Sequence, residues 1–139
     1  MDENPSILSH VSLGTNDLER AGAFYDTVLA TLGIKRFMEH PGAVAWGKAF
    51  PEFWLHEPID GAAASAGNGS HVGFLSPSPE AVDAFHAAAL DAGGTDDGAP
   101  GPRPQYGPPY YGCFVRDPDG NKIEASHWDF AKEQSEQPA

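Results

Sequence analysis

The sequence predicts an α+β fold made of two copies of one module, each with the order strand, helix and three strands. The first observation is a repeat, because the segment His10–Leu13 recurs as His71–Phe74, 61 residues further on. The same spacing matches later residues, namely Asp17 with Ser78, Phe24 with Phe85, Leu29 with Leu90 and Gly33 with Gly94. The second observation is length, because 139 residues can bury one core but are too few for two independent domains. Residues 1–139 are therefore expected to form one domain in which two half-size modules share a core.

Composition and charge argue against several kinds of partner. The chain carries 20 acidic and 8 basic residues, with a formal net charge of −12, whereas nucleic-acid backbones are bound by clustered Lys and Arg. It has no apolar run near the roughly 20 residues that span a bilayer, and its N-terminus lacks the basic start of a signal peptide. We therefore expect a cytoplasmic protein without a nucleic-acid or membrane partner. The single cysteine, Cys113, lies in an apolar run and is expected to fill core space.

The first two elements of module one are predicted to be a strand and a helix. Residues Ile7–Leu13 alternate in character, as in a strand with two distinct faces, and His10 lies opposite the main apolar face. A helix should follow, because apolar residues then recur at helical spacing. Asn16 or Asp17 is suited to cap its start, and Gly33 is suited to end it.

Three further strands are expected to complete module one. Short apolar and aromatic runs lie between Lys35 and His56 and are broken at residues 40–42 and 50–51, which favours a meander. Module one then covers about residues 7–56. Residues 57–70 are rich in Ala, Gly and Ser and predict a linker between the modules.

Module two is expected to cover about residues 71–128 and to open with the strand His71–Leu75. Ser78 is a good helix N-cap, and Pro79 suits the first helical position because its missing N–H would have no partner there. The helix should end at Gly93, since glycine readily adopts the left-handed conformation that closes helices.

The rest of module two is predicted to be a loop, two strands and a tail. The Gly- and Pro-rich residues Asp96–Pro109 predict a long loop over the surface or over a site. Tyr110–Arg116 and Asn121–His127 then read as strands, joined by a turn at Asp117–Gly120 in which Pro presets φ and Gly tolerates positive φ. Residues 129–139 are polar and expected to be a frayed tail.

Three residues that can ligate a metal occupy comparable strand positions. His10 and His71 lie on the opening strands of the two modules, and Glu124 lies on the last strand, on the face opposite Ile123 and Ala125. Two imidazoles and a carboxylate suit a divalent cation such as iron, zinc, nickel, cobalt or manganese. Three protein ligands also leave positions open for water and substrate. The sequence therefore predicts a metal site at His10, His71 and Glu124.

The same residues carry a resemblance to a known family. The run from His10 through Asp17-Leu18 to Ala23-Phe24-Tyr25, the second His71, and the closing motif Asp117–Glu124 resemble the vicinal oxygen chelate superfamily, which includes glyoxalase I, bleomycin-resistance proteins and extradiol dioxygenases. The resemblance spans about residues 7–128, and the closing motif is its most specific part. It implies two βαβββ modules whose sheets form a concave, partly open barrel, with metal at the positions of His10, His71 and Glu124. It also implies a homodimer.

One departure from the family pattern concerns a fourth ligand. Glyoxalase I proteins commonly carry Glu on the closing strand of module one, where setting residues 51–56 against 121–126 places Trp54 opposite Glu124. Tryptophan cannot ligate a metal. Either the fourth ligand is absent, or His56, two residues further along the same face, takes its place.

Several other residues are candidates for the site around the metal. Tyr110, Tyr111 and His56 could serve as a catalytic base, although alternation alone does not decide which tyrosine faces the cleft. Arg103, in the predicted loop, could pair with a substrate carboxylate or phosphate. The predicted substrate pocket therefore contains Trp54, His56, Tyr111 and Arg103, with a preference for a planar ligand.

Two functions are compatible with this pattern. The first is a metal-dependent enzyme acting on a small oxygenated metabolite, as a lyase or isomerase or as an extradiol-type dioxygenase. The alternative is a metal-free binding protein that sequesters a planar ligand, as the bleomycin-resistance relatives do. The metal content of the purified protein would separate the two.

Overall fold

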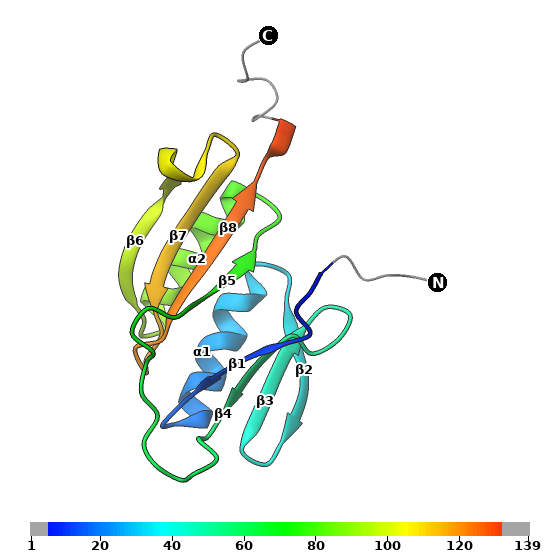
Figure 1. Cartoon of the computed structure of the whole chain (residues 1–139), viewed down its shortest axis with the longest axis vertical. Coiled ribbons are helices and arrows are strands. Elements are labelled where there is room, and N and C mark those ends of the chain that lie inside the picture. The colour runs from blue at the N-terminus through cyan, green and yellow to red at the C-terminus, as the bar shows by residue number, and fades with distance from the viewer. Residues whose placement is uncertain (1–5, 132–139) are drawn as a thin grey trace.

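The computed structural model describes residues 6–131 and contains two βαβββ modules, which lie one above the other in Figure 1. Module one consists of β1 (Val11–Gly14), α1 (Leu18–Ala30), β2 (Lys35–His40), β3 (Ala43–Gly47) and β4 (Phe53–His56). Module two consists of β5 (His71–Leu75), α2 (Pro79–Asp91), β6 (Thr95–Pro102), the short 3-10 helix η1 (Pro104–Tyr106), β7 (Tyr110–Arg116) and β8 (Lys122–Trp128). The predicted α+β fold with two modules is confirmed.

Each module builds one four-stranded mixed sheet, and the two sheets have the same topology. Their strand orders are β1-β4-β3-β2 and β5-β8-β7-β6, and in each the first and last strands of the module pair in parallel. Ser12 is paired with Trp54 in the first sheet, and Gly73 is paired with Glu124 in the second. Because Gly73 follows Ser12 by the repeat spacing of 61 residues, Trp54 is the structural counterpart of Glu124, as the sequence alignment of the closing strands predicted.

Local capping explains where the helices begin. The Asp17 carboxylate accepts a hydrogen bond from the Arg20 backbone N–H, and the Ser78 hydroxyl accepts one from the Ala81 backbone N–H, so each helix has a side-chain N-cap. After α1 the chain passes through Gly33, whose φ of 78° lies in the left-handed region that glycine adopts without strain. The buried side of α1 packs against the sheet of module one.

The two modules share one hydrophobic core. The Phe53 ring of module one packs edge-on against the Phe74 ring of module two, with centroids 5.1 Å apart, and Phe74 in turn contacts Phe85 of α2. Cys113 lies fully buried in the same core, as predicted. Burial raises the pKa of the Cys113 thiol to about 12, so the thiol stays protonated at neutral pH.

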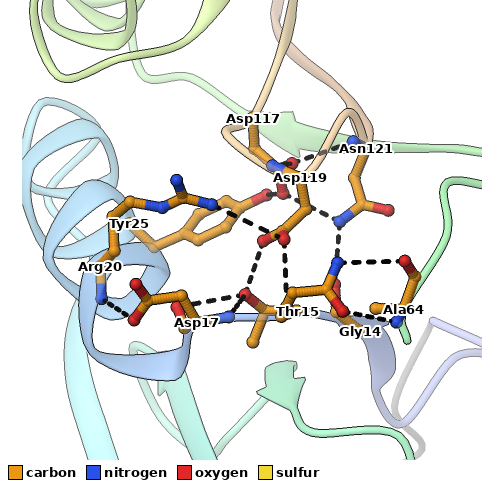
Figure 2. Close-up of polar contacts among 10 residues, drawn as sticks. Gly14, Thr15, Asp17, Arg20, Tyr25, Ala64, Asp117, Asp119 and Asn121 are labelled. Carbon is orange, nitrogen blue, oxygen red and sulfur yellow. Dashed lines mark hydrogen bonds and ion pairs between the residues drawn. The ribbon is translucent and has the colours of Figure 1, made fainter. Parts of the chain in front are cut away.

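A polar network also joins the modules, and we call it the inter-module clasp (Figure 2). It consists of Thr15 and Tyr25 from module one with Asp117, Asp119 and Asn121 from the β7–β8 turn. Tyr25 donates a 2.6 Å hydrogen bond to Asp117, and Thr15 donates one of 2.5 Å to Asp119. The Asn121 amide also donates to the Gly14 carbonyl at 3.1 Å. The predicted turn at Asp117–Gly120 therefore also holds the two modules together.

Two predicted elements differ in the structure. The first strand was expected at Ile7–Leu13 but begins at Val11, because its partner β4 begins at Phe53 and leaves the earlier residues without a strand to pair with. His10 consequently lies just before the strand. The long loop predicted at Asp96–Pro109 was wrong, because Thr95–Pro102 form β6.

Strand β6 tolerates its unusual composition because it is an edge strand. Within residues 6–131 its one partner is β7, with register shifts on both sides of Gly98. Its prolines, which have no N–H to donate, are tolerated because the outer side of the strand has no partner strand in this range. The predicted polar tail lies largely at residues 132–139, outside the described residues. No helix within residues 6–131 is long and apolar enough to cross a membrane.

Candidate functional site

A carboxylate with two hydrogen-bonding neighbours lies on the sheet of module two. Along β8, Ile123 and Ala125 are buried in the core, so Glu124 points to the other face of the sheet. His71 Nε2 lies 2.9 Å from Glu124 Oε1, and the Tyr110 hydroxyl donates a 2.6 Å hydrogen bond to Glu124 Oε2. We call His71, Tyr110 and Glu124 the Glu124 cluster.

The two adjacent tyrosines of β7 point to opposite faces of the sheet. Tyr110 faces Glu124, whereas the Tyr111 hydroxyl donates to Asp83 of α2 at 2.7 Å. Burial of the Tyr110 ring, followed by its hydrogen bond to Glu124, raises the pKa of the Tyr110 phenol far above its ordinary value. Tyr110 is therefore a hydrogen-bond donor that orients Glu124, and it is poorly suited to act as a base. Tyr111 lies away from the cluster.

Two glycines make room for the Glu124 cluster. A Cβ atom on Gly112 would overlap the Tyr110 hydroxyl, so only glycine lets the Tyr110 ring lie across β7 toward Glu124. A Cβ atom on Gly73 would lie 3.2 Å from Glu124 Oε1, which is tighter than ordinary van der Waals contact. Sequence reasoning missed both glycines, although each follows another site residue by two positions and so shares its strand face.

His10 is separate from the Glu124 cluster within one chain. Its Nδ1 atom lies 3.0 Å from the Ser9 hydroxyl, and the residue borders a groove of about 410 Å³ between the modules. His71 borders the same groove, together with Val11, Phe53 and Phe74. Within residues 6–131, no three side chains of His, Cys, Asp or Glu come together in a way that could hold a metal ion. One chain thus assembles His71 with Glu124 and leaves His10 apart.

The corresponding face of module one carries aromatic side chains in place of a carboxylate. The Trp54 indole stacks on the His40 ring, with centroids 6.0 Å apart and planes only 7° apart. His56 Nδ1 lies 2.8 Å from the Glu57 carbonyl oxygen. Trp54 therefore occupies the position equivalent to Glu124 without offering a metal ligand, and the use of His56 as a replacement remains a prediction.

Basic side chains surround Phe114 next to the Glu124 cluster. The predicted pocket residue Arg103 places its guanidinium carbon 5.9 Å from the Phe114 ring centroid, and Lys122 places Nζ 4.9 Å from it. Phe114 is paired with Glu124 in the sheet register. Sequence reasoning missed Lys122 and Phe114, although Lys122 precedes Glu124 by two positions on an alternating strand.

Comparison with known proteins identifies this arrangement of modules. A family model described as the Glyoxalase/Bleomycin resistance protein/Dioxygenase superfamily matches residues 7–125. The crystal structure of a glyoxalase/bleomycin resistance protein from Albidiferax ferrireducens T118 is similar, with 43% sequence identity and a TM-score of 0.82, covering 89% of this chain and 100% of that chain.

More distant structures share the fold. A lactoylglutathione lyase from Agrobacterium tumefaciens is 21% identical with a TM-score of 0.62, covering 90% of this chain and 95% of that chain. A glyoxalase/bleomycin resistance protein/dioxygenase family enzyme from Burkholderia phytofirmans PsJN is 22% identical with a TM-score of 0.67, covering 87% and 98%. No curated protein matches the chain significantly.

Proposed function

Because the chain belongs to the glyoxalase/bleomycin resistance protein/dioxygenase superfamily, we propose that it is a divalent-metal-dependent enzyme acting on a small oxygenated metabolite. The observation that supports this most is the Glu124 cluster, in which an imidazole and a carboxylate meet at 2.9 Å on an open sheet face. A lyase or isomerase and an extradiol-type dioxygenase both need such a site, and the identity of the metal separates these reactions.

The donor atoms of the cluster fit a divalent transition metal. Imidazole nitrogen and carboxylate oxygen suit iron, zinc, nickel, cobalt or manganese, and Tyr110 supplies the outer hydrogen bond that commonly orients a ligating carboxylate. When bound, the metal would act as a Lewis acid toward adjacent oxygens of the substrate. The protein's part is to orient Glu124 through the Tyr110 hydroxyl and to keep His71 beside it.

One chain brings only two of these ligands together, so a third donor is needed. We propose that His10 of a second copy supplies it in a homodimer. The His71 side chain is 45% exposed, which leaves its ring accessible to another chain. An apolar surface suited to contact between copies lies at the other end of the same sheet, where Leu75 is 75% exposed and Trp128 stacks on Phe130.

Metal content tests the enzyme proposal directly. We expect the native chain to bind one metal ion per chain, and His71→Ala and Glu124→Gln each to abolish stoichiometric binding, as measured by elemental analysis after dialysis. Glu80→Gln is the matched control, because Glu80 is an exposed carboxylate on α2. Full metal content in both site variants would refute the proposal.

Mixing two inactive variants tests whether the site is shared. If two copies share each site, a 1:1 mixture of His10→Ala and Glu124→Gln chains contains mixed dimers with one intact site. Statistical exchange in a symmetric dimer then restores about a quarter of the native metal binding. If His10 acts within its own chain, no mixture recovers binding, and the shared-site proposal fails.

A metal-free binding protein is the second candidate, and the Trp54–His40 stack favours it. The Trp54 ring, at the position equivalent to Glu124, and the parallel His40 ring offer a platform for a planar ligand. This function predicts purified protein without metal, ligand binding unchanged by His10→Ala, and binding lost in Trp54→Ala. Stoichiometric metal in the native protein would argue against it.

A further inference from the structure

We propose that the ligand of this site carries a carboxylate or phosphate group, which binds between Arg103 and Lys122 beside the Phe114 ring. The inference rests on the proposed function for the role of the neighbouring Glu124 cluster. The anion site itself follows from three observations. The Arg103 guanidinium has no carboxylate partner within residues 6–131, Lys122 shares its nearest carboxylate with another cation, and Phe114, which both cations contact, lies one strand from Glu124.

The Arg103 guanidinium is half-buried and held by backbone carbonyls. Nη2 donates to the Ala99 carbonyl at 2.7 Å, and Nη1 donates to the Gly101 carbonyl at 3.1 Å. Within residues 6–131, no carboxylate lies within ion-pair distance of Arg103, and its Nε atom makes no hydrogen bond. The carbonyls fix the position of the group but leave its charge uncompensated, which suits it to bind an anion.

Lys122 adds a second cation at the Phe114 ring, from β8, whereas Arg103 follows β6 on the other side of β7. Its nearest carboxylate is Asp97, at 3.7 Å, and that carboxylate already accepts a 3.0 Å hydrogen bond from Arg116 Nε. One carboxylate thus serves two cations, and a positive charge remains. Because the Glu124 carboxylate lies next to Phe114 and offsets part of this charge, an anion would be held by direct contact with Arg103 and Lys122.

The position of Phe114 relates the anion to the Glu124 cluster. Phe114 on β7 is paired with Glu124 on β8, and the His71 ring lies edge-on to Phe114, with centroids 6.0 Å apart. Neighbouring strands are about 5 Å apart. A small oxo or hydroxy acid, or a small phosphate ester, could therefore place its anionic group beside Arg103 and Lys122 and its other oxygens at Glu124.

Glycine on β6 supports this assignment. A Cβ atom on Gly98 would lie 3.3 Å from Arg103 Nη2 and 3.1 Å from Phe114 Cδ1. The absence of a side chain at Gly98 leaves room for the Arg103 guanidinium beside the Phe114 ring. Arg103 is therefore placed by the local backbone rather than extended into solvent.

Inorganic phosphate is the probe for this site, followed by NMR titration of the full chain. We expect saturable chemical-shift changes at Phe114 and its neighbours. Arg103→Gln and Lys122→Gln should each weaken phosphate binding by roughly tenfold or more relative to the native chain, because each variant removes a charge-assisted contact. Lys35→Gln removes the same charge from the exposed strand β2 and should bind phosphate like the native chain. An acetate titration shows whether a carboxylate suffices.

The titration is run on protein as purified and after dialysis against EDTA, with metal measured in both samples. Phosphate binding that depends on Arg103 and Lys122, in protein that contains no metal even as purified, would support the anion site and argue against the metal enzyme. Intact metal binding with no saturable phosphate shift, or with equal shifts in all variants, would overturn the anion site alone. If Arg103→Gln fails to fold, Lys122→Gln decides the outcome, because within residues 6–131 the Lys122 side chain donates no hydrogen bond to a backbone carbonyl and contacts β6 only through the 3.7 Å ion pair with Asp97.

Discussion

The hydroxyl of Tyr25 in α1 donates a 2.6 Å hydrogen bond to the carboxylate of Asp117 in the β7–β8 turn, and both residues are buried. This bond crosses from module one to module two. Asp117 also accepts from the Asp119 and Asn121 backbone N–H groups, so the turn that leads to Glu124 is anchored to the first helix (Figure 2). The inter-module clasp thereby links the relative placement of the modules to the strand that bears the site.

Tyr25→Phe tests the energetic contribution of the clasp. Removing the hydroxyl leaves the buried Asp117 carboxylate with one donor fewer, and such a loss costs about 1–3 kcal/mol of unfolding free energy. Urea unfolding measures the change. Tyr106→Phe is the control, because Tyr106 is exposed and its hydroxyl makes no hydrogen bond within residues 6–131. Equal stability of the two variants would show that the clasp contributes little.

The same tyrosine predicts a loss of stability at high pH. Burial, and then the negative charge of Asp117, raise the pKa of Tyr25 well above its ordinary value of about 10. The unfolded chain therefore loses this proton first as pH rises, so stability is retained below about pH 10 and falls above it. We expect a shallower fall above pH 10 in Tyr25→Phe, measured by denaturant unfolding at several pH values. The same slope in both proteins would contradict this assignment.

Much of the fold could be predicted because the sequence signals are local. The N-caps Asp17 and Ser78 and the alternation around Glu124 act within a few residues, and the repeat of His10 as His71 shows that the same local pattern occurs twice. The alternation of side chains along a strand shows which residues share a face of the sheet, but not which face is the core side. For Glu124 the neighbouring Ile123 and Ala125 identify the core side, so its direction could be predicted.

The remaining features depend on contacts between distant residues. Tyr110 and Tyr111 are chemically alike, and only the pairing of β7 with β8 and α2 shows that Tyr110 faces Glu124. Strand β6 has a loop-like composition, and its strand form depends on pairing with β7. The bond between Tyr25 and Asp117 joins residues 92 positions apart and has no local signature.

Gly112→Ala tests the space that the Tyr110 ring occupies. The new methyl group would overlap the Tyr110 hydroxyl and lie 2.9 Å from the Ala125 carbonyl oxygen, so we expect a loss of about 1–3 kcal/mol in unfolding free energy. Gly101→Ala is the control, because its Cβ would make an ordinary 3.5 Å contact. A displaced Tyr110 should also ionise at lower pH, which tyrosinate absorbance records. Unchanged stability and an unchanged Tyr110 titration would show that the sheet adapts to the extra methyl group.

Tyr110→Phe and Tyr111→Phe separate an orienting role from a structural one, because the two residues are neighbours on one strand and point to opposite faces. Tyr110→Phe removes the donor to Glu124 Oε2 and keeps the ring that packs beside Gly112. Loss of such a partner typically weakens metal binding by roughly 10–100-fold, so we expect that decrease in a competition titration against a chelator. Tyr111→Phe removes only the bond to Asp83 on α2 and should bind metal like the native chain. Equal metal affinity in the two variants, with both folded, would show that Tyr110 does not orient Glu124 for metal binding.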